Sequence, residues 1–330
     1  MTARPDGRAP DEGALDDTAP GSTSPGSTAP GSTSPDSTSP GSSASGGTAP
    51  AAAAPVIAVL GLGEAGSLLA RDLLAAGATV RGYDPAIARP AGLAGAPGFT
   101  TAGSEAEAAT GAGLVLSVNS AKAALSALAA AAGAIEGGRA RWADLNTASP
   151  GVKQQLAALG ERHGIAVTDI AMMSPVPGQG IRVPMLASGG AAAEVAGQLT
   201  ALGARVEVLD GPAGLAATRK LLRSVFYKGM AASIVEALEA ARAAGLEDWL
   251  REHIGQELAR SGAETVDRVA SGTRQHAVRR GAEMGAAAAM LTELGVPPLM
   301  ADASRALHER LQQATSSSPA RPPRPNAGPR

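Results

Sequence analysis

The sequence predicts an α/β protein in which a mostly parallel, doubly wound sheet is followed by an all-helical region. Three observations support this fold class. From Pro55 to about residue 212, short apolar runs alternate with segments of helical periodicity. After residue 212, nearly every segment has a helical pattern. A long segment without proline, from Gly214 to about Ala244, is expected to form one interdomain helix that joins the two parts.

The composition excludes several classes of function. The chain has 330 residues, enough for two domains, and its net charge of -2 with 2% aromatic residues argues against a nucleic-acid partner. The absence of cysteine excludes disulfides and thiolate catalysis, and the four histidines lack metal-ligand spacing, so no metal site is expected. Because no segment resembles a signal peptide or a membrane span, we expect a cytoplasmic protein without a membrane partner.

Both ends of the chain differ in composition from the rest. Residues 1–54 are rich in Pro, Gly, Ser and Thr, and residues 315–330 are rich in Ser, Pro and Arg. Such segments bury too little apolar surface to offset the entropy lost on ordering. We therefore expect a disordered arm at 1–54, domains at 55–212 and 213–314, and a disordered tail at 315–330.

The predicted sheet begins with a glycine turn typical of dinucleotide binding. An apolar run leads into Gly61-Leu62-Gly63-Glu64-Ala65-Gly66, a helical segment, a second apolar run and then Asp84. Gly61 is expected to permit the tight turn, Gly63 to let a pyrophosphate approach the backbone, and Gly66 to let helix and strand pack closely. The helix amino terminus supplies N–H donors for the phosphates. The pattern predicts a Rossmann domain that binds NAD or NADP, and Asp84, as an acceptor for the ribose hydroxyls, favours NAD.

Polar residues follow two of the later predicted strands. Strands are expected at 114–118, 141–145, 165–170, 185–188 and 205–209, and helices at 121–132, 150–163 and 192–202. In a parallel sheet, ligands lie beyond the carboxyl ends of the strands. This places Val118, Asn119 and Asn146 along the cofactor groove. Helix capping or turn chemistry explains the two asparagines equally well.

The loop from Met172 to Gly180 contains a third candidate group. Its prolines and glycines favour a stiff rim at the end of a strand. Ser174 is then a candidate donor to a substrate oxygen, while an incidental serine in a structural loop fits the pattern as well.

One face of the long helix carries cations and hydroxyls. On a period of 3.6 residues, one stripe contains Lys220, Arg223, Ser224, Tyr227 and Lys228. A solvated helix face is one interpretation of this stripe, and a face that closes over a bound cofactor is the other.

Further along the chain, a second polar cluster is predicted in the helical region. Helices are expected at 249–260, 263–270, 274–294 and 300–313. His276, Arg279, Arg280 and Glu283 lie three or four residues apart, on one face of such a helix. A surface ion-pair cluster and an anion-binding edge over the active site both fit these residues.

These motifs together resemble the β-hydroxyacid dehydrogenase superfamily, which includes 3-hydroxyisobutyrate and 6-phosphogluconate dehydrogenases. The resemblance covers about residues 55–313. The glycine turn resembles the family's cofactor turn, and residues 144–150, Asp-Leu-Asn-Thr-Ala-Ser-Pro, are similar to its Asp-x-Ser-Thr-x-x-Pro element. Residues 169–190 have the place and spacing of its substrate loop, and residues 214–223 resemble its Gly-x-x-x-x-x-Lys-x-x-Asn segment. The resemblance implies that Lys220 is the catalytic lysine.

Two departures from the family pattern concern the substrate. Arg223 stands where the family usually has Asn, and Met173-Ser174-Pro175 replaces its Ser-Gly-Gly. Both positions normally touch substrate, so the resemblance does not transfer a substrate. The spacing from Lys220 to Lys228, with His276 and Arg280, is similar to a 6-phosphogluconate-dehydrogenase-like branch that has its own type of helical C-terminal domain.

We therefore expect an NAD(P)-dependent oxidoreductase that acts on the CH–OH group of a small hydroxy acid, or on the keto acid in reverse. Lys220 is the candidate general acid/base, and burial beside Arg223 and Lys228 is expected to lower its pKa. Lys228 is the second candidate base. The candidate substrate-binding residues are Ser174, Arg223, Tyr227, His276 and Arg280.

Three expectations concern alternatives and assembly. Imine reductases share the architecture but typically lack the lysine, and a nucleotide-binding protein without turnover is a further alternative. By resemblance, we expect a homodimer that pairs through the helical domains and brings His276 and Arg280 toward the partner's site. Oxidation to a β-keto acid would permit decarboxylation, although no residue in the sequence requires it.

Overall fold

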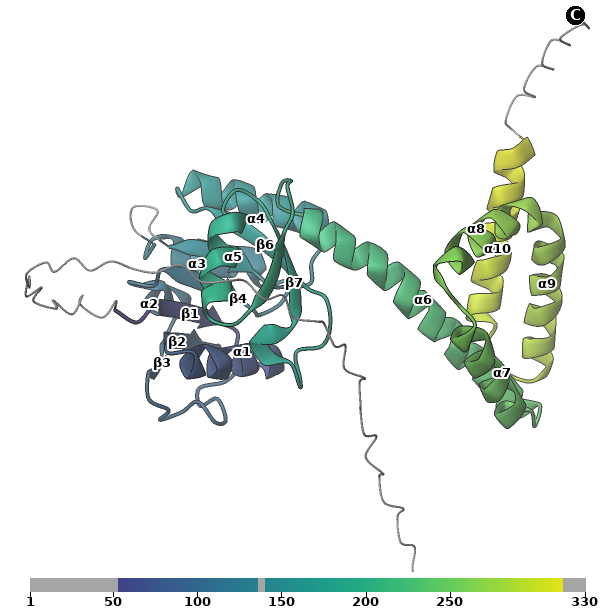
Figure 1. Cartoon of the computed structure of the whole chain (residues 1–330), viewed down its shortest axis with the longest axis horizontal. Helices are drawn as coiled ribbons and strands as arrows, with labels where there is room; N and C mark the ends of the chain where they lie inside the picture. Colours follow the sequence, from purple (N-terminus) through teal and green to yellow (C-terminus); the bar gives the residue numbers. More distant parts are fainter. Residues whose placement is uncertain (1–52, 136–139, 317–330) are drawn as a thin grey trace, which may run out of the picture. The chain divides into compact units, whose positions relative to one another are not determined.

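The computed structural model describes residues 53–135 and 140–316. The expectations of a disordered arm and tail fall on residues that lie almost wholly outside this part of the chain. Within the described residues, alternating strands and helices give way to an unbroken series of helices from Leu215 onward, which confirms the predicted fold class (Figure 1).

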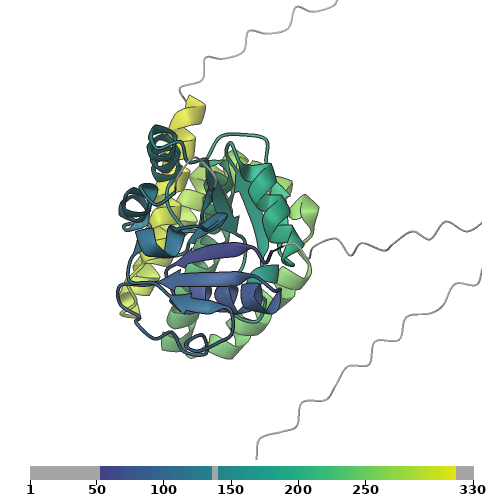
Figure 2. The same ribbon diagram turned by 90° about the vertical axis from the view of Figure 1, so that its left-hand side faces the viewer.

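In the described part of the chain, eight strands form one sheet in the order β3-β2-β1-β4-β5-β6-β7-β8. Neighbouring strands are parallel except for β6 and β7, which are antiparallel. The strands are β1 Val56–Leu60, β2 Thr79–Tyr83, β3 Phe99–Thr101, β4 Leu114–Ser117, β5 Arg141–Asp144, β6 Val167–Met172, β7 Pro184–Ser188 and β8 Arg205–Val208. Figure 2 shows the strands nearest the start of the described chain lying side by side. The sequence analysis missed β3, because three residues carry too short a pattern to recognise.

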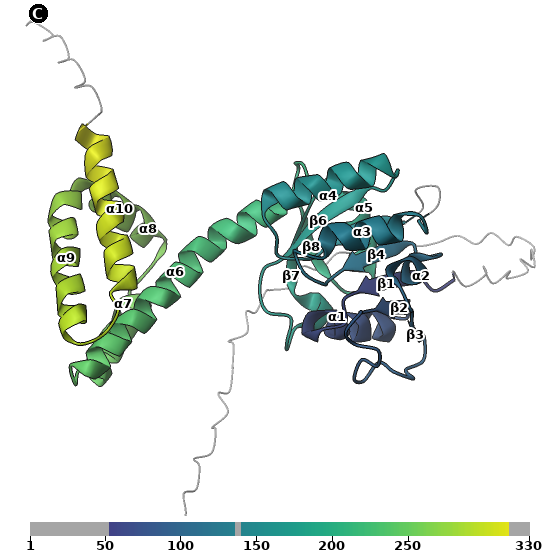
Figure 3. The same cartoon turned by 180° about the vertical axis from the view of Figure 1, so that it is seen from behind.

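Five α-helices cover the two faces of the sheet (Figures 1 and 3). They are α1 Glu64–Ala75, α2 Glu105–Ala109, α3 Ala124–Ala132, α4 Pro150–Arg162 and α5 Ala192–Ala201. Successive side chains of β1 alternate between two cores: Ile57 and Val59 lie in the core with α1 and α5, while Ala58 and Leu60 lie in the core with α2, α3 and α4. Both faces of the central strands are therefore buried, as in a doubly wound sheet.

The remaining helices form the C-terminal part of the fold. They are α6 Leu215–Ala243, α7 Glu247–Ala259, α8 Ala263–Gln275, α9 Ala277–Glu293 and α10 Leu299–Ser316. The prediction of one long helix from Gly214 to Ala244 is confirmed. The predicted break between residues 270 and 274 is wrong, because α8 continues to Gln275 and the chain turns at His276.

Contacts at both ends of α6 connect it to other elements. Near its start, the backbone N–H of Ala216 donates to Ser188 Oγ on β7. Further along, the Glu236 carboxylate accepts the N–H groups of Met300 and Ala301 at 2.7 and 2.9 Å. A carboxylate at this place satisfies donors that the first turn of α10 cannot pair within the helix.

The glycine turn between β1 and α1 depends on close backbone approach. Gly61 has a φ of 100°, and a Cβ at this residue would lie 2.5 Å from the Val118 carbonyl oxygen. A Cβ at Gly66 would collide with the Gly61 carbonyl oxygen, whereas a Cβ at Gly63 would meet no atom within 4 Å. Gly61 and Gly66 are thus required by the fold, and Gly63 faces open space.

We expect Gly66→Ala to destabilise the protein by about 1–3 kcal/mol, since the added methyl group forces the backbone of the turn apart. Urea denaturation measures this change in the free energy of unfolding. Gly63→Ala is the matched control, and its effect should stay within about 1 kcal/mol because only helix capping changes. Equal losses in the two variants would contradict the role assigned to Gly66.

Candidate active site

The amino terminus of α1 has the geometry of a phosphate cradle. Its N-cap residue, Gly63, provides no side-chain cap, so the first N–H groups of the helix are directed at the space beside the turn. A cavity of about 660 Å³ opens here, and its lining includes Leu62, Gly63, Glu64 and Ser67 from the turn and α1. The residues present therefore fit the pyrophosphate of a dinucleotide.

Asp84 contacts this turn through one carboxylate oxygen and its own following segment through the other. Oδ2 accepts the N–H of Leu62 at 2.8 Å, and Oδ1 accepts the N–H of Ala86 at 2.9 Å. The carboxylate thus links the end of β2 to the glycine turn in the protein itself. Each oxygen retains a lone pair, so the expected ribose contact stays a prediction. Two arginines, Arg71 and Arg89, line the same cavity, so its charge does not select NAD over NADP.

Val118 and Asn119 follow β4 at the edge of the same turn. The Val118 carbonyl is the group that approaches Gly61. Asn119 Oδ1 accepts the N–H of Ser120 at 2.7 Å, which is the turn chemistry that the sequence left as one of two interpretations. Both residues lie beyond the carboxyl end of β4, where ligands of such sheets bind.

A buried charged cluster that the sequence pattern does not reveal lies at the carboxyl end of β5 and beside β6. Lys153 of α4 is 1% exposed. Its ammonium lies 2.7 Å from Asp144 Oδ2 and 2.9 Å from Asp169 Oδ1, and it donates to the Asp144 carbonyl oxygen at 2.8 Å. Asp144 and Asp169 are also fully buried. A buried ammonium with this set of oxygen partners is the arrangement that makes burial of charge tolerable.

Asn146 extends this cluster toward β4. Its Nδ2 donates to Asp144 Oδ1 at 2.6 Å and to Ser117 Oγ at 3.0 Å. These bonds fix the amide in the interior rather than at a helix cap. Asn146 also lines the narrow cavity that contains Lys220, so the buried cluster and the candidate base share a wall.

The second carboxylate of the cluster binds the start of α6. Asp169 Oδ2 accepts the N–H groups of Gly214 at 3.0 Å and Ala217 at 2.9 Å. Gly214 adopts a φ of 103°, and a Cβ there would lie 3.0 Å from the Pro150 carbonyl oxygen at the start of α4. The long helix therefore begins where a buried carboxylate and a glycine allow it to approach the sheet.

Lys220 lies one turn into α6 and is half-buried. The narrow cavity around it, which has no room for a water molecule in this structure, is lined by Asn146, Thr147 and Asp169, together with Ala148, Ile170, Ala171, Ala217 and Leu221. Burial, and then the ammonium groups of Lys153 and Lys228, lower the pKa of Lys220, while Asp169 opposes the change. The expected direction of the pKa shift is confirmed. The largest cationic cause, however, is Lys153, and Arg223 is not among the causes of the pKa shift.

Three other members of the helix stripe are more exposed than Lys220, whereas Ser224 is half-buried like it. Arg223, Tyr227 and Lys228 are exposed, and the Arg223 guanidinium lies over the Tyr227 ring, 5.3 Å from its centroid. This cation–π contact orients the arginine along the helix surface. Among the described residues, Lys220 is the stripe residue that lines the cavity beside Asn146.

Ser174 lies in the loop after β6. Its Oγ accepts a hydrogen bond from Gln179 Nε2 at 3.0 Å. The loop is fixed further along, where Asp72 of α1 accepts the N–H of Ile181 at 2.7 Å. Pro177 and Gly178 line the cavity at the glycine turn, so the loop reaches the predicted cofactor site.

The polar cluster of the helical region is arranged differently from the single face that the sequence predicts. His276 is the junction residue between α8 and α9, so it is not on the regular face of α9. Arg280 donates to Thr273 Oγ1 at 2.7 Å, and the exposed Arg279 forms an ion pair with Glu283 at 3.4 Å. Within residues 53–135 and 140–316, the lining of the Lys220 cavity includes neither His276 nor Arg280.

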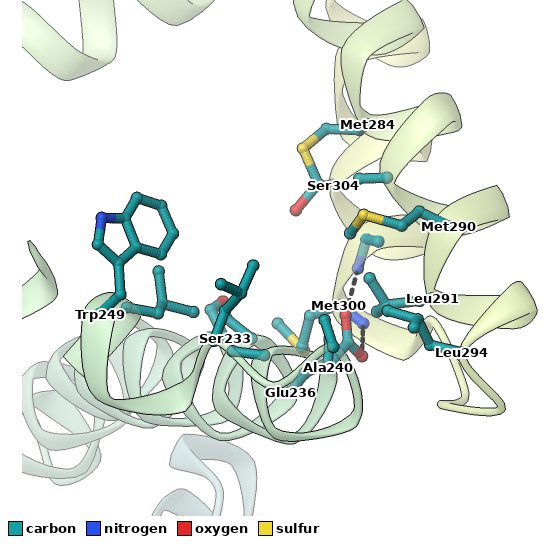
Figure 4. Close-up of a pocket in the computed structure, with 17 residues that line it drawn as sticks. Ser233, Glu236, Ala240, Trp249, Met284, Met290, Leu291, Leu294, Met300 and Ser304 are labelled. Atoms are coloured by element: carbon teal, nitrogen blue, oxygen red, sulfur yellow. Dashed lines mark hydrogen bonds between the residues drawn. The ribbon is translucent and has the colours of Figure 1, made fainter.

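A second cavity of about 500 Å³ lies among α6, α7, α9 and α10 (Figure 4). Its lining is mainly apolar and includes Trp249, Met284, Met290 and Leu294. Its one acidic side chain, Glu236, is already engaged by the start of α10. This cavity offers apolar contact rather than acid–base chemistry.

Two further observations bear on ligands and membranes. In the part of the chain that the structure describes, no group of three or more His, Cys, Asp or Glu residues is placed to hold a metal ion. None of the described helices is long and apolar enough to span a bilayer.

Two family models match separate parts of the chain. Residues 56–208, which contain the whole sheet, match the NAD binding domain of 6-phosphogluconate dehydrogenase. Residues 241–311 match a domain of unknown function, DUF1932. Together with the similar structures below, the two matches support the β-hydroxyacid dehydrogenase-like superfamily. The second match covers the end of α6 and the helices that follow it, which form the helical C-terminal part of the fold.

Several solved structures share this fold. The conserved protein MTH1747 of unknown function, described as similar in structure to 3-hydroxyacid dehydrogenases, is 27% identical, with 79% of this chain and 98% of that chain covered and a TM-score of 0.52. An imine reductase from Myxococcus stipitatus in complex with NADP+ is 20% identical, with coverages of 79% and 95% and a TM-score of 0.65. A reductive aminase from Aspergillus terreus in complex with NADPH and ethyl-5-oxohexanoate is 20% identical, with coverages of 79% and 94% and a TM-score of 0.64. None of the curated proteins matches the chain in sequence.

The family and these neighbours indicate an NAD(P)-dependent oxidoreductase of the hydroxyacid dehydrogenase type. The similarities below 25% identity establish a shared fold. They do not decide between a CH–OH group and an imine as the group acted upon.

The lowered pKa of Lys220 predicts a specific pH dependence of stability. The unfolded chain binds this proton more tightly than the folded protein, so protonated Lys220 destabilises the fold at pH values below its lowered pKa. The penalty disappears as the pH rises from that lowered pKa to the ordinary value for lysine. We therefore expect the stability of Lys220→Met relative to wild type to be greatest at neutral pH and to decline toward alkaline pH.

Urea denaturation at a series of pH values measures this difference in the free energy of unfolding. Lys122→Met, at an exposed position, is the control. The stability of Lys220→Met relative to wild type should decline more steeply with rising pH than that of Lys122→Met. Equal declines in the two variants would contradict a lowered pKa for Lys220.

Proposed function

We propose that this protein is an NAD(P)-dependent oxidoreductase that acts on the CH–OH group of a small hydroxy acid, with Lys220 as the general acid/base. The observation that carries the proposal is the position of Lys220. Its half-buried amine shares a narrow cavity with Asn146, Thr147 and Asp169, beyond the carboxyl end of β5 and beside β6. The glycine turn lies at the carboxyl end of β1, in the same sheet.

The chain's own residues have a limited set of tasks in such a reaction. The nicotinamide, when bound, carries the hydride. Neutral Lys220 Nζ accepts the hydroxyl proton as the alcohol becomes a carbonyl, and in the reverse direction the ammonium returns that proton. A lowered pKa supports this role, because it increases the fraction of neutral amine at working pH.

The substrate carboxylate requires cationic or hydroxyl partners near Lys220. Arg223 is three residues further along α6, and its planar guanidinium suits a bidentate grip on a carboxylate. Ser174, in the loop after β6, is the proposed hydroxyl donor. Tyr227 is proposed to border the substrate beneath the Arg223 guanidinium.

We expect Lys220→Met to reduce kcat/KM by about 10²–10⁴-fold, since positioned acid–base catalysis is worth roughly that factor. The matched control is Lys228→Met, which removes an exposed lysine two turns further along the same helix and should have a much smaller effect. Absorbance at the nicotinamide band, followed with NAD and with NADP across a panel of small hydroxy acids, measures both variants.

The same panel separates the alternatives. Adding keto acids and cyclic imines tests reduction, and turnover of imines alone would replace the hydroxy-acid proposal with an imine reductase. Cofactor binding detected by calorimetry, without turnover of any panel member and without an effect of Lys220→Met, would leave a nucleotide-binding protein that does not catalyse.

We also propose that the protein is a homodimer in which α6 is the main contact. The middle of α6 exposes a run of large apolar and aromatic side chains that includes Leu222, Val225 and Phe226, with Val225 76% and Phe226 67% exposed. Trp249 and Met290, which line the apolar cavity of the helical region, are also exposed. Exposed apolar patches of this kind mark association surfaces. A second copy covering them would bring the partner's helices toward α6.

Such a dimer is the proposed route by which His276 and Arg280 take part in substrate binding. Within one chain, neither lines the Lys220 cavity. A partner's helical region seated along α6 would supply these side chains from the second copy, completing a carboxylate site that one chain leaves open to solvent.

We expect Phe226→Glu to convert the dimer into monomers, because a carboxylate in an apolar interface is strongly disfavoured. Light scattering coupled to size-exclusion chromatography measures the mass at two protein concentrations. Val208→Glu, at an exposed apolar residue of β8, is the matched control and should leave the dimer intact. A wild-type protein that is monomeric at both concentrations would overturn the proposal.

A further inference from the structure

The buried amine of Lys153 is a feature that the proposed chemistry leaves unexplained. It belongs to α4, it is 1% exposed, and two carboxylates surround it. One ammonium between two carboxylates gives the cluster a formal charge of -1. Ion pairs buried to this extent contribute little net stability, because desolvation offsets their attraction. Stability alone therefore does not account for this arrangement.

The two oxygens of Asp169 divide their contacts between Lys153 and α6. Oδ1 lies 2.9 Å from the Lys153 ammonium. Oδ2 accepts the N–H groups of Gly214 and Ala217 at 3.0 and 2.9 Å. Ala217 is three residues before Lys220, so the two share one face of α6, and both line the narrow cavity. A short path of direct contacts thus runs from Lys153 through Asp169 to the turn that carries Lys220.

We propose that Lys153 is a positioning residue of the candidate active site, which engages the Asp169 carboxylate and thereby holds Lys220 free in its cavity. The inference rests on the proposed function insofar as Lys220 is the acid/base. Without the Lys153 ammonium, Asp169 would be an uncompensated buried carboxylate on the wall of the cavity of Lys220. The nearest amine able to neutralise it is then Lys220 itself, which would be held as an ammonium in an ion pair.

The proposed role requires that Lys153 lower the pKa of Lys220, and the charged groups around Lys220 agree with this. The charged groups on the packed elements are Lys153 from α4, Asp144 from β5 and Asp169 from β6, and on α6 itself Arg223 and Lys228. Lys153 and Lys228 lower the pKa of Lys220, and Asp169 raises it. Removing Lys153 therefore takes away a positive charge that lowers the pKa of Lys220. The Asp169 carboxylate, which raises that pKa, is then no longer paired with an ammonium.

The chain is well suited to a direct measurement, because it contains four lysines: Lys122, Lys153, Lys220 and Lys228. Reductive methylation with ¹³C-formaldehyde gives each accessible lysine an NMR signal whose shift reports protonation. Lys220→Arg assigns the signal of Lys220. The titration is performed on the full-length protein without substrate, so its outcome does not depend on knowing the reaction.

The test variant is Lys153→Met combined with Asp144→Asn. This pair of changes keeps the cluster at a formal charge of -1 and retains Asp169, so a shift is attributable to the loss of Lys153 and not to total charge. We expect the titration midpoint of Lys220 to rise by about one pH unit, as loss of a nearby like charge at an effective dielectric constant of about 20 predicts. The single variant Lys153→Arg keeps the positive charge, so its Lys220 titration midpoint should stay close to that of the wild type.

Asp169→Asn provides a second test of opposite sign. The Asn side-chain oxygen can still accept from Gly214 and Ala217, but the raising charge is gone, so the midpoint of Lys220 should fall. If circular dichroism shows that the double variant does not fold, the Lys220 midpoint of Asp169→Asn serves as the test of the inference. An unchanged Lys220 midpoint in the folded double variant, or an unchanged midpoint in Asp169→Asn, would overturn the inference.

Kinetics separate this inference from the proposed function. If Lys220 is the base for oxidation, the acidic limb of the kcat/KM profile of the double variant moves to higher pH by the same amount as the NMR midpoint. A purely structural role for Lys153 would lower the melting temperature and move neither the limb nor the midpoint. A shifted midpoint in a protein that turns over no hydroxy acid would remove the proposed function and leave the link between Lys153 and Lys220 in place.

Discussion

The arrangement on which the rest of the site depends is the burial of one ammonium between two carboxylates. Lys153, Asp144 and Asp169 come from α4, β5 and β6, and their contacts join these three elements. Because charge in a dry environment is tolerable only with close partners, each member restricts where the others can lie. The start of α6 is then fixed by the remaining oxygen of Asp169. The place of Lys220 follows from that anchor.

The glycine turn is a second constraint, and it depends on backbone approach rather than charge. Gly61 faces the Val118 carbonyl, and Gly66 faces the Gly61 carbonyl, so neither position tolerates a side chain. Asp84 accepts the N–H of Leu62 within the turn. The turn therefore holds its shape through the protein's own contacts, and the open space at Gly63 is left for a ligand. One sheet thus presents a cradle for phosphates and a cavity with a candidate base.

The helical region exposes apolar surface that the proposed dimer would cover. Large apolar side chains on α6, among them Val225 and Phe226, are exposed, and a mainly apolar cavity lies among α6, α7, α9 and α10. Burial of such surface is the main driving force of association. The proposed dimer would cover these exposed side chains. The same dimer would bring His276 and Arg280, which lie away from the Lys220 cavity of their own chain, to the site of the partner.

The sequence by itself determined the fold class, the glycine turn, the long helix and the candidate base, because these depend on local periodicity and on residue types at fixed spacing. It did not determine the helix break at His276, because a local pattern does not fix the residue at which one helix ends and the next begins. It also did not determine that β6 and β7 are antiparallel, because a local pattern does not set the direction of a strand in the sheet. Only the tertiary structure showed that Lys153 pairs with Asp144 and Asp169. These three residues are well separated in sequence, and a lysine on a predicted helix is ordinarily a solvated residue. The order of the strands decides that this one is buried.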